Sequence, residues 1–303
     1  MSNKVIIASD SVGEWKKMKK ELNKKVIIAS DSTCDLSAEL IERYQIKILP
    51  LGVSLGDQQY RDGVDINPDM IYENYEKTGT LPKTAAVNVA EFDEFFAKQT
   101  AEGNEVVLFT ISSDMSSTFN NARLAAQEYE GVYPVNSQNL STGGGLLVVA
   151  AAEMAAEGKS AKEIAEACTA LREKVDASFV IDNLEFLHKG GRCSAIAAFG
   201  ANLLSLKPCV VVREGKMGVG KKYRGKFHMT LKQYIADRIG DGSEIDTSRI
   251  FVTHAGCDAA IVDACVQQVQ DMGLFDEVLI TRAGCTVSAH CGRNTLGVLF
   301  IRK

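Results

Sequence analysis

The feature that most constrains the fold is the alternation of short β-branched apolar runs with amphipathic helical segments over 303 residues. Apolar runs of this length, rich in Val and Ile, are typical of buried strands. A helix between two such runs returns the chain so that successive strands pair in parallel. The pattern therefore predicts an α/β protein with mostly parallel sheets and strands at 26–29, 47–54, 106–111, 132–135, 179–181, 209–212, 250–253, 278–281 and 296–301.

Two of the intervening segments carry clear helix signals. Ser160 is followed three residues later by Glu163, the arrangement of a capping box. The segment after Asp258 has apolar residues at helical spacing and stops near Gly273, which can terminate a helix. Because a polar turn at 157–159 follows an alanine-rich helical segment, we expect a domain boundary there. The chain then divides into two α/β domains, residues 25–158 and residues 159–303.

The octapeptide KVIIASDS occurs twice, at 4–11 and at 25–32. The second copy leads into a helical segment whose start Asp35 or Ser37 can cap. The first copy leads into a lysine-rich segment with only a thin apolar stripe. We therefore expect the second copy to be the strand of the fold. Residues 1–24 are expected to be a duplicated N-terminal extension: an added edge strand, a loosely held arm with a short helix, or an extension without function.

Charge and composition argue against several classes of function. The formal net charge of −5 argues against a nucleic-acid-binding protein, which usually carries a basic surface. No apolar run is long enough to span a membrane, and the first residues carry no cleavable signal. The eight cysteines include no C-x-x-C pair, and the spacing of Cys285, His290 and Cys291 matches no common zinc pattern. We expect reduced thiols in a cytoplasmic protein that has no metal and no cofactor.

Small polar residues follow several of the predicted strands. Ligands of open α/β sheets bind outside the carboxyl ends of the strands, so these segments are candidate site segments. Asp31 and Ser32 follow the first strand, where Asp31 could act in catalysis, cap the next helix or support a site. Residues 112–118 place five hydroxyl groups within seven positions, which is more than helix capping requires. Hydroxyls and free backbone N–H groups at a helix start favour an anion.

Two glycine-containing segments and a late histidine complete the set of candidates. Gly143, Gly144 and Gly145 precede an apolar helix, and they permit close approach of either a neighbouring segment or an apolar ligand chain. Arg192 follows a glycine pair and precedes a markedly apolar segment, which suits either an anionic group of a ligand or a structural tie between loops. His290 lies beside a glycine turn before the last predicted strand.

Taken together, these segments resemble the DegV family of bacterial fatty-acid-binding proteins. The resemblance begins at residue 25, follows the family order and covers nearly all of the remaining chain. It is carried by SDSTCDLS (30–37), LPLGVSLGDQQYRDGVDI (49–66), LPKTAAVNVAEF (81–92), ISSDMSSTFNNA (111–122), LEFLHKGGRCS (184–194), SLKPCV (205–210) and AHCGRNTLGVLF (289–300).

The resemblance implies two α/β domains with a long-chain fatty acid in a lipid tunnel at or near their junction. It implies that the hydroxyls of Thr84 and Ser116 hold the carboxylate. Other polar residues of the same segments would support this head-group network: Arg192, His290, Ser117, Thr118, Asp31 and Ser32. The glycines at 143–145 would lie close either to the acyl tail or to a neighbouring segment of the chain.

The resemblance also implies a partner. In many bacteria such proteins present the fatty acid to a separate dihydroxyacetone-kinase-like subunit, which phosphorylates the carboxylate with ATP. This chain would then be a carrier and the non-catalytic subunit of a fatty acid kinase. The basic segment 215–226 is either a solvated turn or a docking surface for that kinase.

The chain departs from the family pattern in three segments. The family's Thr-Ser-Gln-Pro-Ser is TAAVN at 84–88, and its Ser-Gly-Thr-Tyr is SSTF at 116–119. Both departures keep the head-group hydroxyls. The glycine-rich turn after His290 is GRN at 292–294, which adds the cation of Arg293 near the mouth of the expected tunnel.

Two other classes of function remain open. A hydrolase or phosphotransferase could use Asp31, Ser116 and His290, provided that a base lies within hydrogen-bond reach of a nucleophile. No Gly-x-Ser-x-Gly elbow accompanies these residues. A regulatory scaffold could instead use the bound lipid as a signal.

Overall fold

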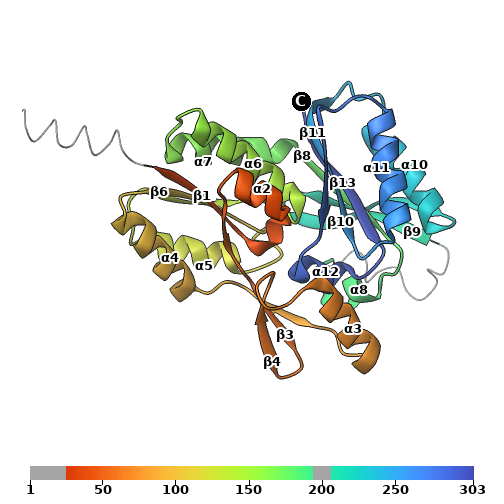
Figure 1. Cartoon of the computed structure of the whole chain (residues 1–303), viewed down its shortest axis with the longest axis horizontal. Coiled ribbons are helices and arrows are strands. Elements are labelled where there is room, and N and C mark those ends of the chain that lie inside the picture. Colours follow the sequence, from red (N-terminus) through yellow and green to blue (C-terminus); the bar gives the residue numbers. More distant parts are fainter. Residues whose placement is uncertain (1–24, 194–205) are drawn as a thin grey trace, which may run out of the picture.

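The computed structural model describes residues 25–193 and 206–303, and the predictions for residues 1–24 lie outside the described part (Figure 1). Strands and helices form one parallel sheet, one larger mixed sheet and one small antiparallel sheet. The prediction of an α/β protein is therefore confirmed.

The first sheet is parallel throughout and has the strand order β2-β1-β6-β7. Its register pairs Ile28 of β1 with Val107 of β6, and Val107 in turn with Tyr133 of β7. Alternate side chains of these strands enter two different cores on the two faces of the sheet. The strands are β1 (Val26–Asp31), β2 (Lys47–Leu49), β6 (Glu105–Thr110) and β7 (Val132–Asn136).

Helices cover both faces of the first sheet (Figure 1). Helices α4 (Val89–Ala101) and α5 (Thr118–Ala126) pack on one face, where Phe92 and Phe96 are fully buried. Helices α6 (Thr142–Ala156) and α7 (Ala161–Leu171) pack on the other. Short elements complete this half: η1 (Ser32–Cys34), α2 (Ala38–Arg43) and η2 (Arg172–Lys174).

The predicted strand at 47–54 is wrong as a single element, because the chain changes sheet at Pro50. Strand β2 stops at Leu49, the residue before Pro50. The chain then enters a small antiparallel sheet with the order β4-β3-β5. Its strands are β3 (Gly52–Leu55), β4 (Gln58–Arg61) and β5 (Lys83–Ala85).

The second large sheet has the order β10-β9-β8-β13-β11-β12, and it corrects the expectation of mostly parallel pairing in the second half. Of its described strand pairs, β11–β12 is parallel and the others are antiparallel. One cause is the tight turn at Glu214-Gly215, where both residues have positive φ and connect β9 and β10 as a hairpin. The strands are β8 (Val175–Ile181), β9 (Leu206–Arg213), β10 (Lys216–Arg224), β11 (Ile245–Ala255), β12 (Glu277–Arg282) and β13 (Thr295–Arg302).

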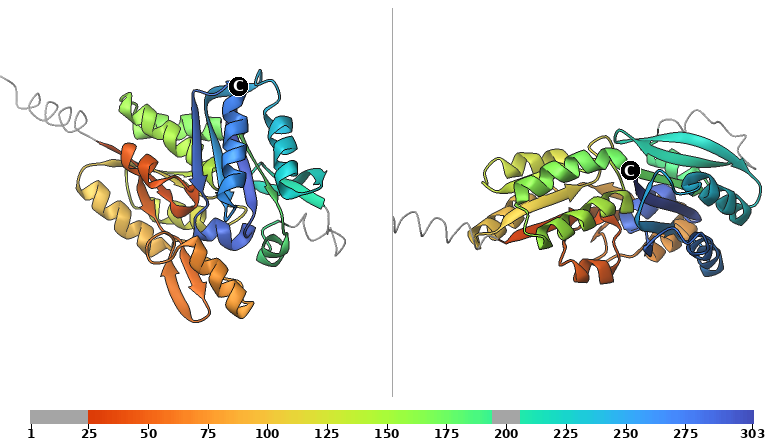
Figure 2. Two further views of the ribbon diagram at one scale, coloured as in Figure 1. Left: turned by 45° about the vertical axis from the view of Figure 1, so that its right-hand side comes forward. Right: turned by 90° about the horizontal axis from the view of Figure 1, so that it is seen from above.

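Helix α6 lies between the two large sheets and contacts strands of both (Figure 2). Leu146, Leu147, Val148 and Val149 are all buried because the helix is covered on every side. On the far face of the second sheet lie α10 (Phe227–Ile239) and α11 (Ala259–Asp271). One continuous apolar core therefore joins the sheets through α6.

The predicted domain boundary at 157–159 stays a prediction. Helix α7 follows that point in the chain but packs against β6 and β7 of the first sheet. The change of sheet comes later, where η2 leads into β8.

Three short helices gather around the small sheet (Figure 1). Their shared core includes the fully buried side chains of Ile71 and Tyr72 and the ring of Phe186. The helices are α3 (Pro68–Thr78), α8 (Glu185–Gly190) and α12 (Cys285–Cys291). Helix α12 comes from the second half of the chain, yet it packs against α3, β3, β5 and η1 of the first half.

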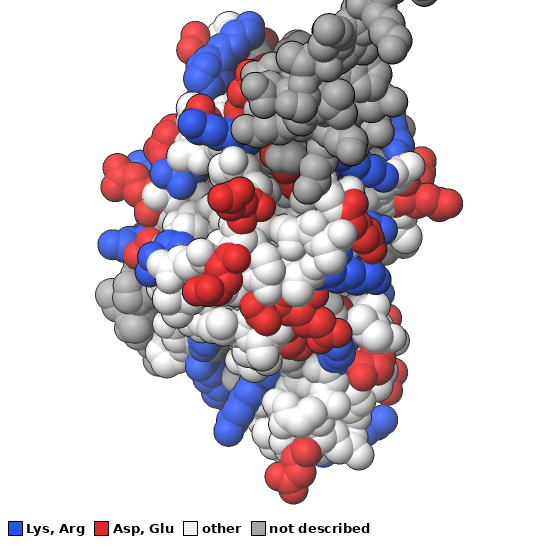
Figure 3. All heavy atoms as spheres, turned by 90° about the vertical axis from the view of Figure 1, so that its left-hand side faces the viewer, with Lys and Arg blue, Asp and Glu red and all other residues white. Residues whose placement is uncertain are grey.

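The surface in Figure 3 carries acidic and basic side chains side by side, in keeping with the modest net charge of −5. Among the described residues, no helix combines the length and apolarity needed to cross a bilayer.

Candidate functional site

A cavity of about 190 Å³ opens where the small sheet, the loop after β6 and helices α8 and α12 meet. One part of its wall is polar and the rest is apolar. The polar part consists of Thr84, Ser116, Ser117, Arg192, Thr286 and His290. The apolar part includes Leu51, Ile111, Met115, Leu140, Leu187, Met217, Val287 and Cys291.

Thr84 and His290 form the central polar pair of this cavity. Thr84 lies on β5, His290 lies in the last turn of α12, and Thr84 Oγ1 is 3.0 Å from His290 Nε2. Burial, and to a smaller extent the nearby charge of Arg192, lowers the pKa of His290 to about 4. The imidazole is therefore neutral near pH 7, so one ring nitrogen carries a proton that it can donate and the other can only accept a hydrogen bond.

A glycine at position 190 is required by the position of His290. A Cβ added to Gly190 would lie 2.6 Å from His290 Nδ1, closer than real side chains approach. Arg192, two residues on, donates a hydrogen bond from Nη1 to the Gly190 carbonyl oxygen at 2.8 Å. The Gly-Gly-Arg segment thus places the histidine ring and a guanidinium at one end of the cavity.

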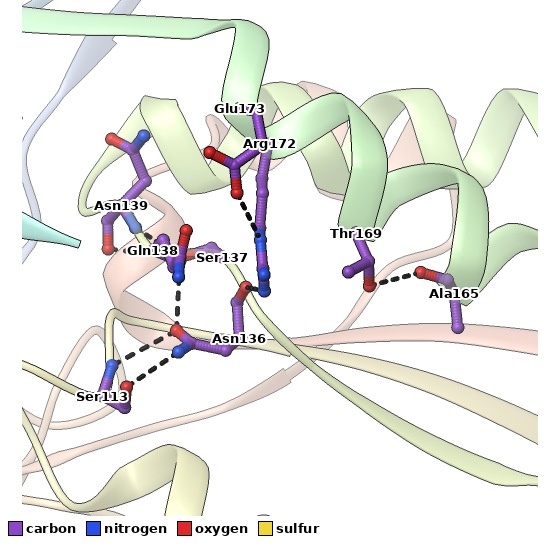
Figure 4. A network of polar contacts seen from close by, with 9 residues as sticks. All are labelled: Ser113, Asn136, Ser137, Gln138, Asn139, Ala165, Thr169, Arg172 and Glu173. Atoms are coloured by element: carbon purple, nitrogen blue, oxygen red, sulfur yellow. Dashed lines mark hydrogen bonds and ion pairs between the residues drawn. The ribbon is translucent and has the colours of Figure 1, made fainter. Parts of the chain in front are cut away.

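The hydroxyl-rich loop after β6 is held by hydrogen bonds to the turn between β9 and β10 and to the last residue of β7. Ser112 Oγ donates to the carbonyl oxygen of Gly215 at 2.7 Å. The side chain of Asn136 accepts from Ser113 N at 3.2 Å and donates to Ser113 Oγ at 2.8 Å (Figure 4). Arg172 Nη1 donates to the Asn136 carbonyl oxygen at 3.0 Å. This loop is therefore fixed before any ligand binds.

The five hydroxyls of the loop have different surroundings. Ser112 is fully buried in the contact to Gly215, and Ser113 is tied to Asn136. Ser116 and Ser117 line the cavity. Thr118 is fully buried, and its Oγ1 lies 2.8 Å from Ser116 Oγ. Thr118 thus fixes the position of the Ser116 hydroxyl through this contact.

A second, apolar cavity of about 30 Å³ lies deeper in the molecule. It shares Leu140, Val287 and Cys291 with the first cavity, so these three side chains form a waist between the two voids. Its remaining walls come mainly from β8, β9, β11 and β13 of the second sheet: Ala177, Phe179, Val212, Thr253, His254, Ala255, Thr295, Gly297 and Leu299.

Asp31 and Ser32 lie outside the lining of either cavity. Burial raises the pKa of Asp31 to about 6, and its carboxylate accepts hydrogen bonds from Thr33 and from the backbone of Ile111. Ser32 Oγ accepts from Leu51 N and donates to Asp62. Ile111 and Leu51 line the cavity, so Asp31 and Ser32 support the cavity wall through them without lining it.

The three glycines at 143–145 lie inside α6, and they also fall outside the lining of both cavities. A Cβ on Gly143 would lie 2.1 Å from Asn139 Oδ1, and one on Gly145 would lie 2.8 Å from the Cys34 carbonyl oxygen. The close approach that the glycines permit is thus made by the protein's own atoms. The structure therefore favours close approach of a neighbouring segment of the protein over close approach of an apolar ligand chain.

Sequence reasoning missed a group of buried carboxylates beneath the site. Asp35 and Asp62 are 6% and 3% exposed and lie at the N-terminal end of α12. Asp35 was expected only as a possible helix cap, and Asp62 was assigned no role. Their hydrogen bonds to the first turn of α12 join residues more than 200 positions apart, which no local pattern reveals.

The triad of a hydrolase is not assembled. Asp31 bonds to Thr33 and Ile111, Ser116 to Thr118, and His290 to Thr84. Within the described part of the chain His290 Nδ1 has no hydrogen-bond partner, so no carboxylate orients the ring as a triad requires. The described residues also contain no group of three or more His, Cys, Asp or Glu side chains that could hold a metal ion.

Comparison with known proteins gives a consistent result. The chain is 36% identical over 289 residues to a DegV domain-containing protein of Clostridium perfringens, covering 90% of this chain and 97% of the relative. It is 32% identical over 281 residues to one of Clostridium acetobutylicum, covering 92% and 99%.

Solved structures show the same fold. A fatty-acid-binding DegV family protein from Thermus thermophilus is 30% identical, with a TM-score of 0.83 over 92% of this chain and 100% of that one. A stearic-acid-binding protein from Eubacterium ventriosum is 26% identical, with a TM-score of 0.78 over 92% and 98%. Residues 25–303 match the family model described as "Uncharacterised protein, DegV family", and the chain belongs to the DegV family.

Proposed function

We propose that this protein binds one long-chain fatty acid, with the carboxylate at Thr84 and Ser116 and the acyl tail directed through the waist into the deeper apolar cavity. The observation that carries the proposal is the division of the first cavity into a hydroxyl-rich end and an apolar remainder. The fatty acids found with the Thermus and Eubacterium relatives support the same class of ligand.

The polar end of the cavity suits a carboxylate. A carboxylate accepts hydrogen bonds and donates none, so its partners must supply protons. If Nε2 of the neutral His290 carries the ring proton and donates to Thr84, then the Thr84 hydroxyl is free to donate into the cavity. Ser116 can donate in the same way while Thr118 donates to it. Arg192 contributes positive charge at the same end.

The tail supplies most of the affinity in this proposal. A sixteen-carbon acid has about fourteen methylenes, and burying them is worth on the order of 11 kcal/mol before ordering costs of several kcal/mol are subtracted. Each hydrogen bond to the charged head group adds roughly 1.5–3 kcal/mol before desolvation. The hydroxyls therefore orient the ligand more than they hold it.

The tail requires a rearrangement at the waist. The two voids measure about 190 and 30 Å³, below the roughly 300 Å³ at which preformed ligand pockets begin. Leu140, Val287 and Cys291 separate them. We expect these side chains to change rotamer as the tail enters, so that the two voids join into one tunnel.

Mass spectrometry of the denatured, purified protein tests the proposal directly. We expect release of one C14–C18 fatty acid per chain. The double variant Thr84→Ala with Ser116→Ala should lower the affinity for palmitate roughly 150-fold, since two hydrogen bonds to the charged head group, each worth about 1.5 kcal/mol at the lower end, are lost. The double variant Thr78→Ala with Ser248→Ala removes two exposed hydroxyls outside both cavities and serves as the control. Unchanged palmitate affinity in the first variant would rule out this head-group site.

We further propose that the loaded protein presents the carboxylate to a separate dihydroxyacetone-kinase-like subunit that phosphorylates it with ATP. A clamp of hydroxyls leaves the carboxylate more nucleophilic than a tight arginine pair would. Strand β10 offers a docking surface in Lys221 and Lys222, with Lys221 Nζ 2.6 Å from Asp237. Reversing both lysines to Glu should abolish acyl phosphate formation by an added kinase subunit while palmitate binding persists. Unaltered phosphorylation would remove this surface from the proposal.

We place this function in the cytoplasm. All eight cysteines are free thiols, and seven of them are buried. Unpaired thiols are the usual state in a reducing compartment. Fractionation of cells that express the tagged protein tests this placement, and recovery in an exported fraction would contradict it.

A further inference from the structure

Helix α12 carries His290 into a site whose other polar groups come from distant parts of the chain. The helix packs against η1, α3, β3 and β5 of the first half, and against α8 and β11 of the second. It has only seven residues, too few to be stable without tertiary contacts. Whatever holds its first turn therefore also sets the position of His290 in its last turn.

Two buried carboxylates hold that first turn. Asp62 Oδ1 accepts from Cys285 N at 2.7 Å, and Asp62 Oδ2 accepts from Thr286 N at 2.9 Å. Asp35 Oδ1 accepts from Gly284 N at 2.8 Å. Three successive backbone N–H groups, which a helix start leaves without intrahelical partners, are thus satisfied by side chains from the first half of the chain.

Neighbouring residues hold both carboxylates in position for these hydrogen bonds. Ser32 Oγ donates to Asp62 Oδ2 at 3.1 Å, and Ser141 Oγ lies 2.5 Å from Asp35 Oδ2. A Cβ on Gly284 would lie 3.1 Å from Asp35 Oδ1 and 3.3 Å from Asp62 Oδ1, so a glycine there gives both carboxylates room. Asp35 itself has a left-handed backbone, with φ of 49°.

We propose that Asp62 and Asp35 are positioning residues of the ligand site, which fix the first turn of α12 so that its last turn holds His290 against Thr84. Neither carboxylate lines the cavity, so both act through the helix. This inference rests on the proposed binding of a fatty acid for its affinity readout, but its readout on the histidine ring does not need the ligand.

Burial sets the charge state of Asp35. Burial, reinforced by Asp62 and Asp31, raises the pKa of Asp35 to about 8, so this carboxyl is mostly neutral at pH 7. The other ionisable groups around it are the thiols of Cys34 on η1 and of Cys285 and Cys291 on α12. Burial raises the pKa of all three thiols far above neutrality, so they stay uncharged. Ionisation of Asp35 above pH 8 would bring a buried negative charge close to Asp31 and Asp62.

The first test replaces Asp62 by Asn in the full chain. The amide of Asn offers one acceptor oxygen in place of two, so Cys285 N or Thr286 N would face an NH₂ group. We expect the Kd for palmitate to rise about tenfold, and the pKa of His290, followed by NMR of the ring, to move from about 4 toward 6.5 as the ring becomes less buried. The matched control is Asp65→Asn, an exposed carboxylate on the same loop that accepts from Arg61 N.

The second test is Asp35→Asn, which keeps the hydrogen-bonding capacity of a neutral carboxyl and is therefore expected to fold. Palmitate affinity at pH 7 should match that of the unaltered protein. Between pH 7 and 9 the affinity of the unaltered protein should fall, whereas that of Asp35→Asn should stay level. His290 and the palmitate carboxyl do not change charge in this range.

The outcomes separate the inference from the proposed function. If the unaltered protein fails to bind palmitate, the proposed function is wrong, and the His290 titration in Asp62→Asn still decides the positioning role. If palmitate binds but Asp62→Asn leaves both the Kd and the His290 titration unchanged, the positioning role of Asp62 is refuted. If the palmitate affinity of Asp35→Asn follows the same pH profile as that of the unaltered protein, the positioning role of Asp35 is refuted.

A second variant covers the case in which Asp62→Asn does not fold. Ser32→Ala removes one contact of Asp62 and should shift the His290 pKa in the same direction. An unchanged His290 pKa in Ser32→Ala would count against the positioning role of Asp62.

Discussion

Two polar clusters lie close together in this protein, one along the cavity and one beneath it. Thr84, Ser116 and His290 line the cavity with groups that can still bind a ligand. Asp35 and Asp62 accept hydrogen bonds from the protein's own backbone and hydroxyls. Thr84 and Ser116 of the first cluster, and both carboxylates of the second, follow or lie in strands and loops of the first half of the chain. The comparison teaches that a polar residue after a strand becomes part of a ligand site only when the fold leaves its hydrogen-bonding capacity open.

The largest difference between the clusters should appear in stability without ligand. Asp62→Ala removes the acceptor of two backbone N–H groups and of Ser32, and should lower the free energy of unfolding by about 3 kcal/mol. Thr84→Ala removes a half-buried hydroxyl beside a cavity and should cost under about 1 kcal/mol. Urea denaturation of ligand-free protein measures both changes in the free energy of unfolding. Equal losses in the two variants would contradict the expected difference between the two clusters.

The clusters should also give opposite pH dependences of stability. The pKa of Asp35 is raised to about 8, so the folded state binds more protons than the unfolded state and stability falls as pH rises from about 4 to 8. The pKa of His290 is lowered to about 4, so stability falls as pH drops from 6.5 to 4.

Variants can assign each branch of that pH profile to its cluster. Asp35→Asn should flatten the fall toward pH 8, and His290→Gln should reduce the loss toward pH 4, each by a few kcal/mol, since one pKa unit corresponds to about 1.4 kcal/mol. Denaturation midpoints measured from pH 4 to 8 decide the matter. A variant that changes the opposite branch would contradict its assignment.

A smaller effect, on ligand affinity, is expected from adding a methyl group next to His290 in the cavity cluster. Gly190→Ala places a methyl group 2.6 Å from His290 Nδ1 and should displace the ring, weakening palmitate binding about tenfold. Gly218→Ala on β10 is the matched control, since a Cβ there has no heavy atom within 4 Å. Equal affinity in the two variants would show that the position of His290 does not matter for binding.

The smallest effect sharpens the comparison within the cavity cluster itself. Ser117 lines the cavity but is exposed, whereas Ser116 is partly buried and supported by Thr118. Ser117→Ala should therefore change palmitate affinity less than threefold, because solvent already satisfies its hydroxyl. Isothermal titration measures the change, and a larger loss would add Ser117 to the carboxylate contacts.

Much of the fold could be predicted because its signals are local. The strands predicted at 26–29, 106–111 and 132–135 lie within two residues of the ends of β1, β6 and β7. The capping box at Ser160 and Glu163 is present as expected. The break at Pro50 and the antiparallel order of the second sheet were missed, because strand order depends on contacts between segments far apart in the chain.

The candidate site was only partly predictable for the same reason. Thr84, Ser116, Arg192 and His290 do meet at one cavity. The waist residues Leu140, Val287 and Cys291 look like ordinary core positions in the sequence, and only their placement between two voids distinguishes them.

By itself, the sequence determined which segments become strands and helices, where hydroxyls concentrate, and where glycines give room, since these depend on neighbours within a few residues. Only the tertiary structure decided which polar groups keep hydrogen-bonding capacity for a ligand and which have that capacity satisfied by the protein itself. Asp62 meets Cys285 and Thr286 across 223 and 224 positions, and these contacts make it a support for α12 rather than a ligand residue. Hydrogen-bond satisfaction is a property of three-dimensional neighbours, and the order of residues along the chain does not contain it in readable form.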